Sequence, residues 1–232
     1  MCRVAFIAAM EREVAPLIRS WNFREIEHDG RRYKLFESGD AVLICGGIGA
    51  QAARRATEAM IQETRPGRVV SVGFAGALDS TLQVADVLEP RIVVNAADGS
   101  RVDTRSGQGT LVSYNAVANR EQKQRLAKAY ASVAVDMEAA AVAQAAEVHG
   151  VEFGALKAVS DMTDFAMPPV EKFVGSDGKF QSPQFAVHVA MRPWLWGRTI
   201  ALAGNCTKAS RALCEAIESY LARENAVVEV TA

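Results

Sequence analysis

The chain has 232 residues, of which 50% are hydrophobic and 23% are charged, and its formal net charge is -1. This composition suits a folded domain with a substantial core and argues against a disordered chain. The near-neutral charge gives no sign of a nucleic-acid partner or of a strongly basic surface for anionic membranes.

Two further features bear on the cellular compartment. No stretch is apolar for long enough to span a bilayer, and residues 1–3 lead directly into a short apolar run without the pattern of a signal peptide. The cysteines (Cys2, Cys45, Cys206 and Cys214) show no spacing typical of a metal site. We therefore expect reduced thiols in a cytoplasmic protein.

Strand and helix patterns alternate along most of the chain. Strands are predicted at 4–9, 32–37, 41–45, 68–72, 87–94, 110–113 and 153–160. Helices are predicted at 11–20, 50–64, 120–131 and 136–149, with a polar surface loop at 95–109. The alternation predicts an α/β fold: a single-domain α/β/α sandwich over residues 1–232, with a mixed, mostly parallel central sheet.

Two glycine-rich segments follow predicted strands. Residues 47–52 (GIGAQA) fit the fingerprint of a dinucleotide site, but that site also needs an acidic residue about 20 positions further on. The next strand ends at residues 72–74 (VGF) without one, so an ordinary strand-to-helix turn is favoured. Residues 73–77 (GFAGA) are predicted to form a second turn, where small side chains allow either close ligand approach or tight packing.

Acidic residues follow three apolar, strand-like runs of the sequence. Asp136 is explained by the helix dipole, which favours a negative charge at the start of a helix. Asp161, taken alone, is explained by an Asx turn or a helix cap. Glu138 precedes an alanine-rich helix and, if it points inward, needs partners that ligand hydroxyls could supply. With Glu13, these positions predict one pocket that binds sugar hydroxyls and moves protons.

The order of these segments resembles the nucleoside phosphorylase superfamily, and within it the 5'-methylthioadenosine/S-adenosylhomocysteine nucleosidases. The matching segments all lie within about the first 165 residues. They are 8–14 (AAMEREV), 47–49 (GIG), 73–78 (GFAGAL), 135–139 (VDMEA) and 158–161 (AVSD).

The resemblance implies hydrolysis of the N-glycosidic bond of a 5'-substituted adenosine, with release of adenine. Asp161 matches the general acid that protonates N7 of the purine, and Ser160 matches the residue that orients it. Glu13 matches the residue that activates water. Glu138 matches the acceptor of ribose hydroxyls, and Met137 the side chain that packs against the sugar.

The resemblance carries further expectations about ligands and assembly. It implies a small-molecule nucleoside substrate, no metal, no organic cofactor and a homodimer. Further substrate contacts are expected from Ile48, Phe74, Ala75, Gly76, Lys157 and Phe165. Protonation of the base also requires the pKa of Asp161 to rise from about 3.9, which burial and negative neighbours would achieve.

Departures from the family pattern leave alternatives open. Phe74 replaces a small polar residue, Lys157 replaces an arginine, and residues 117–118 stand where a purine-stacking aromatic is expected. The base specificity is therefore open, and a binding module without catalysis is an alternative. Glu13 would repel phosphate, which favours water over phosphate as the nucleophile, with a phosphorylase as the other alternative.

Residues 166–232 diverge most from the nucleosidases. They resemble hopanoid-associated phosphorylase-like proteins, which implies an adenosyl-lipid substrate as a further alternative. On that view several apolar side chains line a lipid pocket or contact a membrane, whereas core packing or a dimer interface is the simpler interpretation. These side chains are Phe165, Phe173, Phe185, Met191, Trp194 and Trp196.

Overall fold

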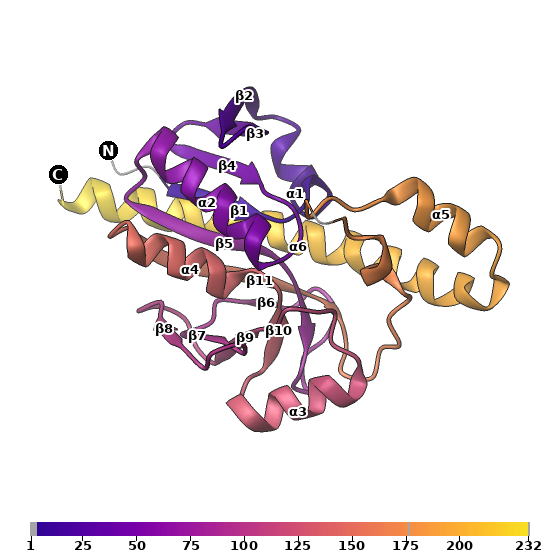
Figure 1. The fold of residues 1–232 in the computed structure, drawn as a ribbon. Helices are drawn as coiled ribbons and strands as arrows, with labels where there is room; N and C mark the ends of the chain where they lie inside the picture. Colours follow the sequence, from indigo (N-terminus) through magenta and orange to yellow (C-terminus); the bar gives the residue numbers. More distant parts are fainter. Residues whose placement is uncertain (1–3, 176, 232) are drawn as a thin grey trace.

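A computed structural model describes residues 4–175 and 177–231, which form a mixed 11-stranded sheet with helices on both faces (Figure 1). The strands are β1 (Val4–Ala8), β2 (Asn22–His28), β3 (Arg31–Ser38), β4 (Ala41–Cys45), β5 (Arg68–Ala77), β6 (Val87–Leu88), β7 (Ile92–Asn95), β8 (Arg101–Asp103), β9 (Thr110–Ser113), β10 (Ala134–Asp136) and β11 (Glu152–Asp161). The helices are α1 (Glu11–Ile18), α2 (Ala50–Thr64), α3 (Arg120–Tyr130), α4 (Ala139–Val148), η1 (Val170–Phe173), α5 (Ser182–Ala190) and α6 (Pro193–Thr231). The predicted α/β/α sandwich is confirmed.

The order of the strands places several strand ends at one edge of the sheet. The main path runs β2-β3-β4-β1-β5-β10-β9-β7-β8, and β11 pairs with β5 and β6. Strands β4, β1, β5 and β11 are mutually parallel where they pair. Their carboxyl ends therefore meet at a common edge, where ligands usually bind in open α/β sheets.

Alternating side chains of β1 explain the two layers of helices. Phe6 packs on the face covered by α1 and α6, in one core with Val14 and Leu213. Ile7 points to the other face, where it packs with Ala56 of α2 and other apolar residues of α2 and α4. Both faces of the central strands are thus buried, as expected for parallel strands with continuous apolar sequences.

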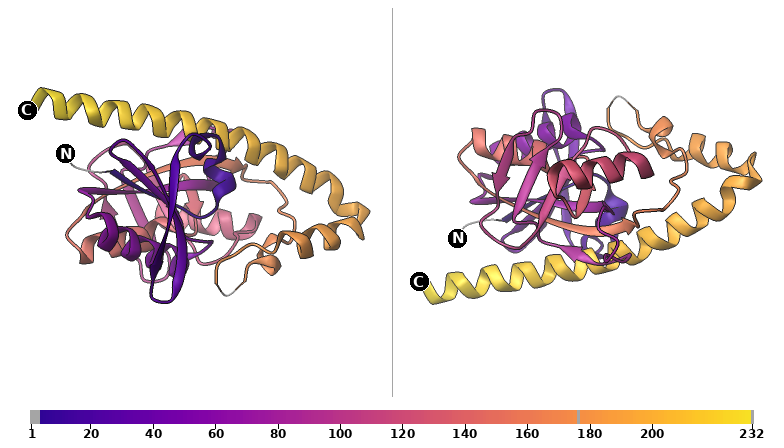
Figure 2. Two further views of the ribbon diagram at one scale, coloured as in Figure 1. Left: turned by 90° about the horizontal axis from the view of Figure 1, so that it is seen from above. Right: turned by 90° about the horizontal axis from the view of Figure 1, so that it is seen from below.

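The longest helix, α6, runs along one face of the molecule and then continues beyond it (Figure 2). Its middle turns contribute Ala209, Leu213 and Ile217 to the core at intervals of one helical turn. Its first turns lie beyond the body and pair with α5 in a protruding helical hairpin (Figure 1).

Four local predictions differ from the structure, one of them the surface loop predicted at 95–109, in which Arg101–Asp103 forms β8. Residues 73–77 continue β5 instead of turning, because residues 73–76 pair with β11 and residues 76–77 pair with β10. The fourth helix begins at Ala139, since Asp136 still belongs to β10. The strand predicted at 87–94 is split in two around Pro90, which cannot donate a ladder hydrogen bond.

The described cysteines are Cys45, Cys206 and Cys214, and all three are free thiols. Burial raises the pKa of the Cys206 thiol to about 11 and also raises that of Cys214. Such thiols are poor nucleophiles near neutral pH. Cys2 lies outside the described residues.

Candidate functional site

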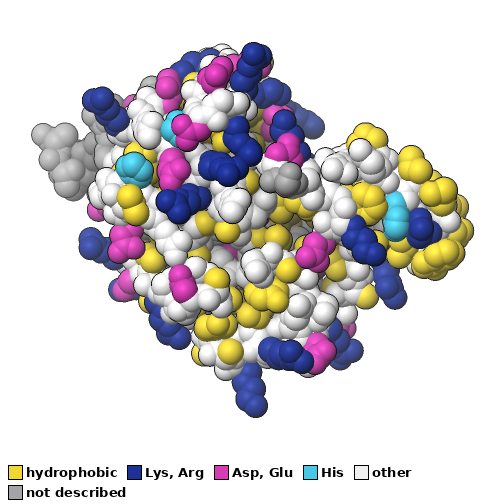
Figure 3. Space-filling view, viewed as in Figure 1, with side chains coloured by type: hydrophobic (Ala, Val, Ile, Leu, Met, Phe, Trp, Pro, Cys, Tyr) yellow, Lys and Arg dark blue, Asp and Glu magenta, His cyan; other side chains and the backbone are white. Residues whose placement is uncertain are grey.

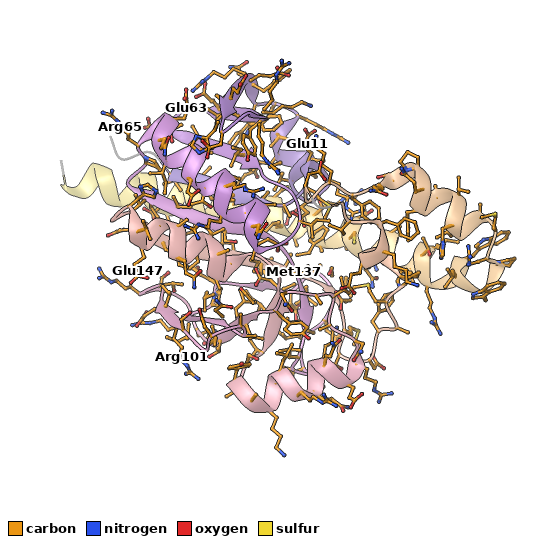
Figure 4. All side chains as sticks on the ribbon, viewed as in Figure 1. Glu11, Glu63, Arg65, Arg101, Met137 and Glu147 are labelled. Atoms are coloured by element: carbon orange, nitrogen blue, oxygen red, sulfur yellow. The ribbon has the colours of Figure 1, made fainter. Side chains whose placement is uncertain are left out.

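A cavity opens at the carboxyl edge of the central strands. Its walls come from the ends of β1, β5, β10 and β11, the turn before α2, helix α3 and the segment that includes η1. The lining residues are Ala9, Met10, Arg12, Glu13, Ile48, Phe74, Ala75, Gly76, Ala116, Val117, Ala118, Lys123, Val135, Asp136, Met137, Glu138, Ser160, Asp161, Met167, Val170, Val174 and Phe180. Met137 is labelled in Figure 4 and lies near the middle of the molecule.

Glu13 reaches the cavity from the first turn of α1. Its Oε2 accepts hydrogen bonds from the backbone N–H groups of Ala9 and Met10, both at 3.1 Å. Burial raises the pKa of this carboxyl, against the lowering effect of the Met10 N–H and of Lys157. A raised pKa makes Glu13 a stronger base toward a bound water molecule than an exposed glutamate is.

Glu138 lies immediately before α4 and is held by the glycine-rich turn that precedes α2. The backbone N–H of Gly49 donates to Oε1 of Glu138 at 2.8 Å. Burial, together with the neighbouring Asp136 carboxylate, raises the pKa of Glu138 to about 7. The turn that resembled a dinucleotide fingerprint thus positions a carboxylate at the start of α4.

A buried ion pair stands behind these two glutamates. Lys157 of β11 places Nζ 2.9 Å from Oδ2 of Asp136, and it also donates to Oγ of Ser71 at 3.0 Å. Burial acts to lower the pKa of Lys157, but the Asp136 and Glu138 carboxylates outweigh it and the pKa is raised. Oδ1 of Asp136 accepts a hydrogen bond from the Ser113 hydroxyl at 2.5 Å.

The third acid of the cavity, Asp161, ends β11 and is held from both sides. The hydroxyl of Ser160 donates to Oδ1 at 2.7 Å. The ammonium of Lys123, which reaches over from α3, donates to Oδ2 at 2.5 Å and to the carbonyl of Met162 at 2.7 Å. The charged neighbour of Asp161 is therefore a cation, opposite in sign to the neighbours expected from the sequence.

Two glycines of β5 make room for these acids. A Cβ on Gly73, whose φ is +152°, would lie 3.3 Å from Oε2 of Glu13. A Cβ on Gly76 would lie 2.9 Å from Oδ2 of Asp161 and 3.1 Å from Nζ of Lys123. The small residues of this segment therefore let two carboxylates approach the strand closely.

Most residues predicted from the sequence lie together at this cavity. Glu13, Glu138, Asp161 and Ser160 belong to its polar part. The remaining predicted lining residues are Met137, Phe74, Ala75, Gly76 and Ile48.

Two predicted residues lie outside the lining. Lys157 is only 1% exposed and is fully occupied by Asp136 and Ser71, so it supports the site from behind. Phe165 is half-buried away from the cavity, and Met167 and Val170 of the same segment line it instead.

Sequence reasoning did not single out Lys123. It shares the buried face of α3 with Leu126, one turn further on, and its side chain is only 4% exposed. A lysine on the apolar face of an amphipathic helix is the signal that could have identified it, because a buried ammonium requires a partner.

A groove between α1 and α6 borders the cavity. The cavity has a volume of about 150 Å³, close to that of a site for one aromatic ring. The groove, with a volume of about 510 Å³, shares Arg12, Val170 and Phe180 with it. Its far end is lined by Leu202, Ala203 and other residues of α6.

Comparison with known protein families shows which family this chain belongs to. The model of the Phosphorylase superfamily matches residues 3–117 and 93–181, which together cover most of the chain. The chain belongs to the Phosphorylase superfamily. Its matched region contains every acidic residue of the cavity and also Lys123.

The following members and solved structures are each less than 30% identical to this chain in sequence. The 5'-methylthioadenosine/S-adenosylhomocysteine nucleosidase of Staphylococcus aureus is 27% identical over 198 residues, which cover 69% of this chain and 87% of that protein. Among solved structures, futalosine hydrolase of Helicobacter pylori has a TM-score of 0.72 at 18% identity and covers 96% of this chain and 98% of its own. S-adenosylhomocysteine nucleosidase of Streptococcus pyogenes, in complex with 5-methylthiotubericidin, has a TM-score of 0.70 at 19% identity, with 95% and 96% covered. These structures share the fold.

Proposed function

We propose that this member of the superfamily hydrolyses the N-glycosidic bond of a 5'-substituted purine nucleoside of the methylthioadenosine or S-adenosylhomocysteine type, with release of adenine. The observation that carries the proposal is the convergence of Glu13, Glu138 and Asp161 on one cavity. Carboxylates around a sugar stabilise the positive charge that develops as a glycosidic bond breaks.

The proposed reaction begins at the base. The bond between C1' and N9 breaks, its electron pair moves into the purine, and N7 accepts a proton from the Asp161 carboxyl. Lys123 is the adjacent source of that proton, since its ammonium already donates to Oδ2 of Asp161. Ser160 holds the other carboxyl oxygen in place.

The reaction is completed at the sugar. Glu138 accepts hydrogen bonds from ribose hydroxyls, and Met137 packs against the ring. Glu13 takes a proton from the attacking water, whose oxygen forms the new bond to C1'. The raised pKa of Glu13 supports this role, because a base is most effective when its pKa lies near the working pH.

Charge distribution favours water over phosphate as the nucleophile. A phosphate dianion at C1' would face the carboxylates of Glu13 and Glu138. The nearby ammonium of Lys157 is neutralised by Asp136 and does not line the cavity. The groove beyond Val170 and Phe180 supplies space for the 5' substituent.

The direct test is release of free base from 5'-methylthioadenosine and from S-adenosylhomocysteine, followed by chromatography. We expect release by the wild-type protein, and loss of turnover without loss of analogue binding in Asp161→Asn. Asp164→Asn, which changes an exposed acid three residues further on, is the matched control and should retain activity. Tight binding of both nucleosides without any release of base would instead identify a binding module.

A further inference from the structure

The α5–α6 hairpin is the most exposed apolar part of the described chain. Met191 is 65% exposed, Trp194 is 73% exposed and Ile200 is 71% exposed. Val187 and Trp196 are also exposed. Elsewhere in the described residues, only Phe23 and Val148 are large hydrophobic side chains with comparable exposure. An exposed cluster of this kind marks an interaction surface.

The hairpin is built to stand away from the rest of the molecule. Helix α5 has no buried residue, and of residues 193–200 at the start of α6 only Leu195 is buried. Inside its base, Phe173 and Phe180 each pack against Phe185, with ring centroids 5.4 Å apart. The aromatic cluster of the hairpin therefore lies at its base, apart from the exposed apolar side chains.

The charged residues of the segment that contains the hairpin are all basic. Residues 178–214 contain no aspartate or glutamate, although the whole chain carries a net charge of -1. The same residues include Lys179, Arg192, Arg198, Lys208 and Arg211. In Figure 3 the protruding lobe shows apolar side chains beside basic ones, and its outer end carries no acidic side chain on the visible face.

The chemistry of the tip suits the boundary between lipid head groups and acyl chains. Tryptophan prefers this boundary, and basic residues nearby are attracted to anionic head groups. The indole N–H of Trp196 donates to the carbonyl of Val189 at 2.9 Å, so this ring can enter an apolar layer without an unsatisfied donor. No helix among the described residues is both long and apolar enough to cross a membrane.

We propose that the α5–α6 hairpin docks this protein peripherally on an anionic lipid bilayer, with Trp194, Trp196 and Met191 inserted at the head-group boundary. A second copy of the chain fits this face less well. A two-fold interface brings the same patch of each copy together and would oppose Arg198 and its basic neighbours to themselves. Anionic head groups provide the complementary charge.

The test is flotation of the full-length protein with vesicles of phosphatidylcholine alone and of an equimolar mixture of phosphatidylcholine and phosphatidylglycerol. We expect binding to the mixed vesicles, weakened by salt, and roughly tenfold weaker partitioning for the double variant Trp194→Ala/Trp196→Ala. Phe23→Ala removes an equally exposed aromatic side chain from β2 and should bind like the wild type.

A charge reversal separates the basic contribution from the apolar one. Arg198→Glu should lose binding to the mixed vesicles, whereas Arg101→Glu on β8, an exposed arginine of the body, should not. Failure of the wild-type protein to float with either vesicle would overturn the proposal. Light scattering measures the oligomeric state in solution. A wild-type dimer together with a monomeric Trp194→Ala/Trp196→Ala variant would also overturn the proposal, because a second copy of the chain would then cover this face.

Discussion

The ammonium of Lys123 lies 2.5 Å from Oδ2 of Asp161, in the wall of a cavity that two other carboxylates share. The two residues are far apart in sequence and both are nearly inaccessible to water. We propose that Asp161 protonates the leaving base, and through this pair it can regain its proton from Lys123. Until that proton moves, the ammonium of Lys123 also places a positive charge where electrons accumulate as the base departs.

The first prediction concerns this pair. Lys123→Gln should lower kcat by roughly 10²-fold, because a contribution of general-acid catalysis is lost, with a smaller effect on KM. Steady-state kinetics of base release measures both constants, at a temperature where circular dichroism shows the variant folded. Lys128→Gln, an exposed lysine of the same helix, is the control and should be unchanged. A folded Lys123→Gln protein with wild-type kcat would remove Lys123 from the mechanism.

The second prediction concerns the close approach of β5 to the same pair. Gly76→Ala adds a Cβ 2.9 Å from Oδ2 of Asp161, so the carboxyl must move and kcat should fall at least about tenfold. Gly204→Ala adds the same methyl group to α6, where nothing lies within 4 Å. This control should keep full activity and gain stability by about 0.5–1 kcal/mol. Equal activity of the two variants would contradict the proposed sensitivity to the position of Asp161.

The third prediction concerns the ion pair behind the cavity. Lys157→Met leaves the Asp136 carboxylate buried without its cation and should lower the free energy of unfolding by about 3–5 kcal/mol. Urea denaturation measures this quantity. Lys34→Met breaks an exposed pair with Glu11 and should cost no more than about 1 kcal/mol. Adding Asp136→Asn to Lys157→Met should restore part of the loss, because the unpaired charge is then absent.

The fourth prediction concerns pH. Folding raises the pKa of Glu138 from its ordinary value of 4.5 to about 7, so between these values the folded state holds a proton that the unfolded state releases. The stability supplied by the protonated side chain is complete below about pH 4.5 and is lost as the pH rises to about 7. Glu138→Gln cannot titrate, so its free energy of unfolding should decline less than that of the wild type over this range. Parallel stability curves for the two proteins would contradict the assigned pKa.

The sequence predicted the elements that depend on local pattern. Helix α2 was predicted with its observed bounds, since its amphipathic run ends at a proline and glycine pair. Strand β2 was missed because Ile26 is its only buried residue and the others are polar or exposed. Residues 73–77 were predicted as a turn because their glycines are locally ambiguous, and long-range pairing with β10 and β11 keeps them extended.

Some residues of the candidate site could likewise be predicted from the sequence, and others could not. The acids at strand ends could be identified because parallel strands bring their carboxyl ends together. The partners of these acids could not, since the contacts of Lys123 with Asp161 and of Lys157 with Asp136 join distant segments. Asp136, explained from sequence by the helix field alone, serves mainly as the counter-charge of Lys157.

The central claim is that the carboxylates of the cavity direct water to C1' of a nucleoside. The most direct measurement is mass spectrometry of the sugar released from 5'-methylthioadenosine in water enriched in oxygen-18, with phosphate present. We predict a free sugar that carries one oxygen-18 atom, formed at the same rate with and without phosphate and lost in Glu13→Gln. A sugar 1-phosphate, or base release that requires phosphate, would contradict the account.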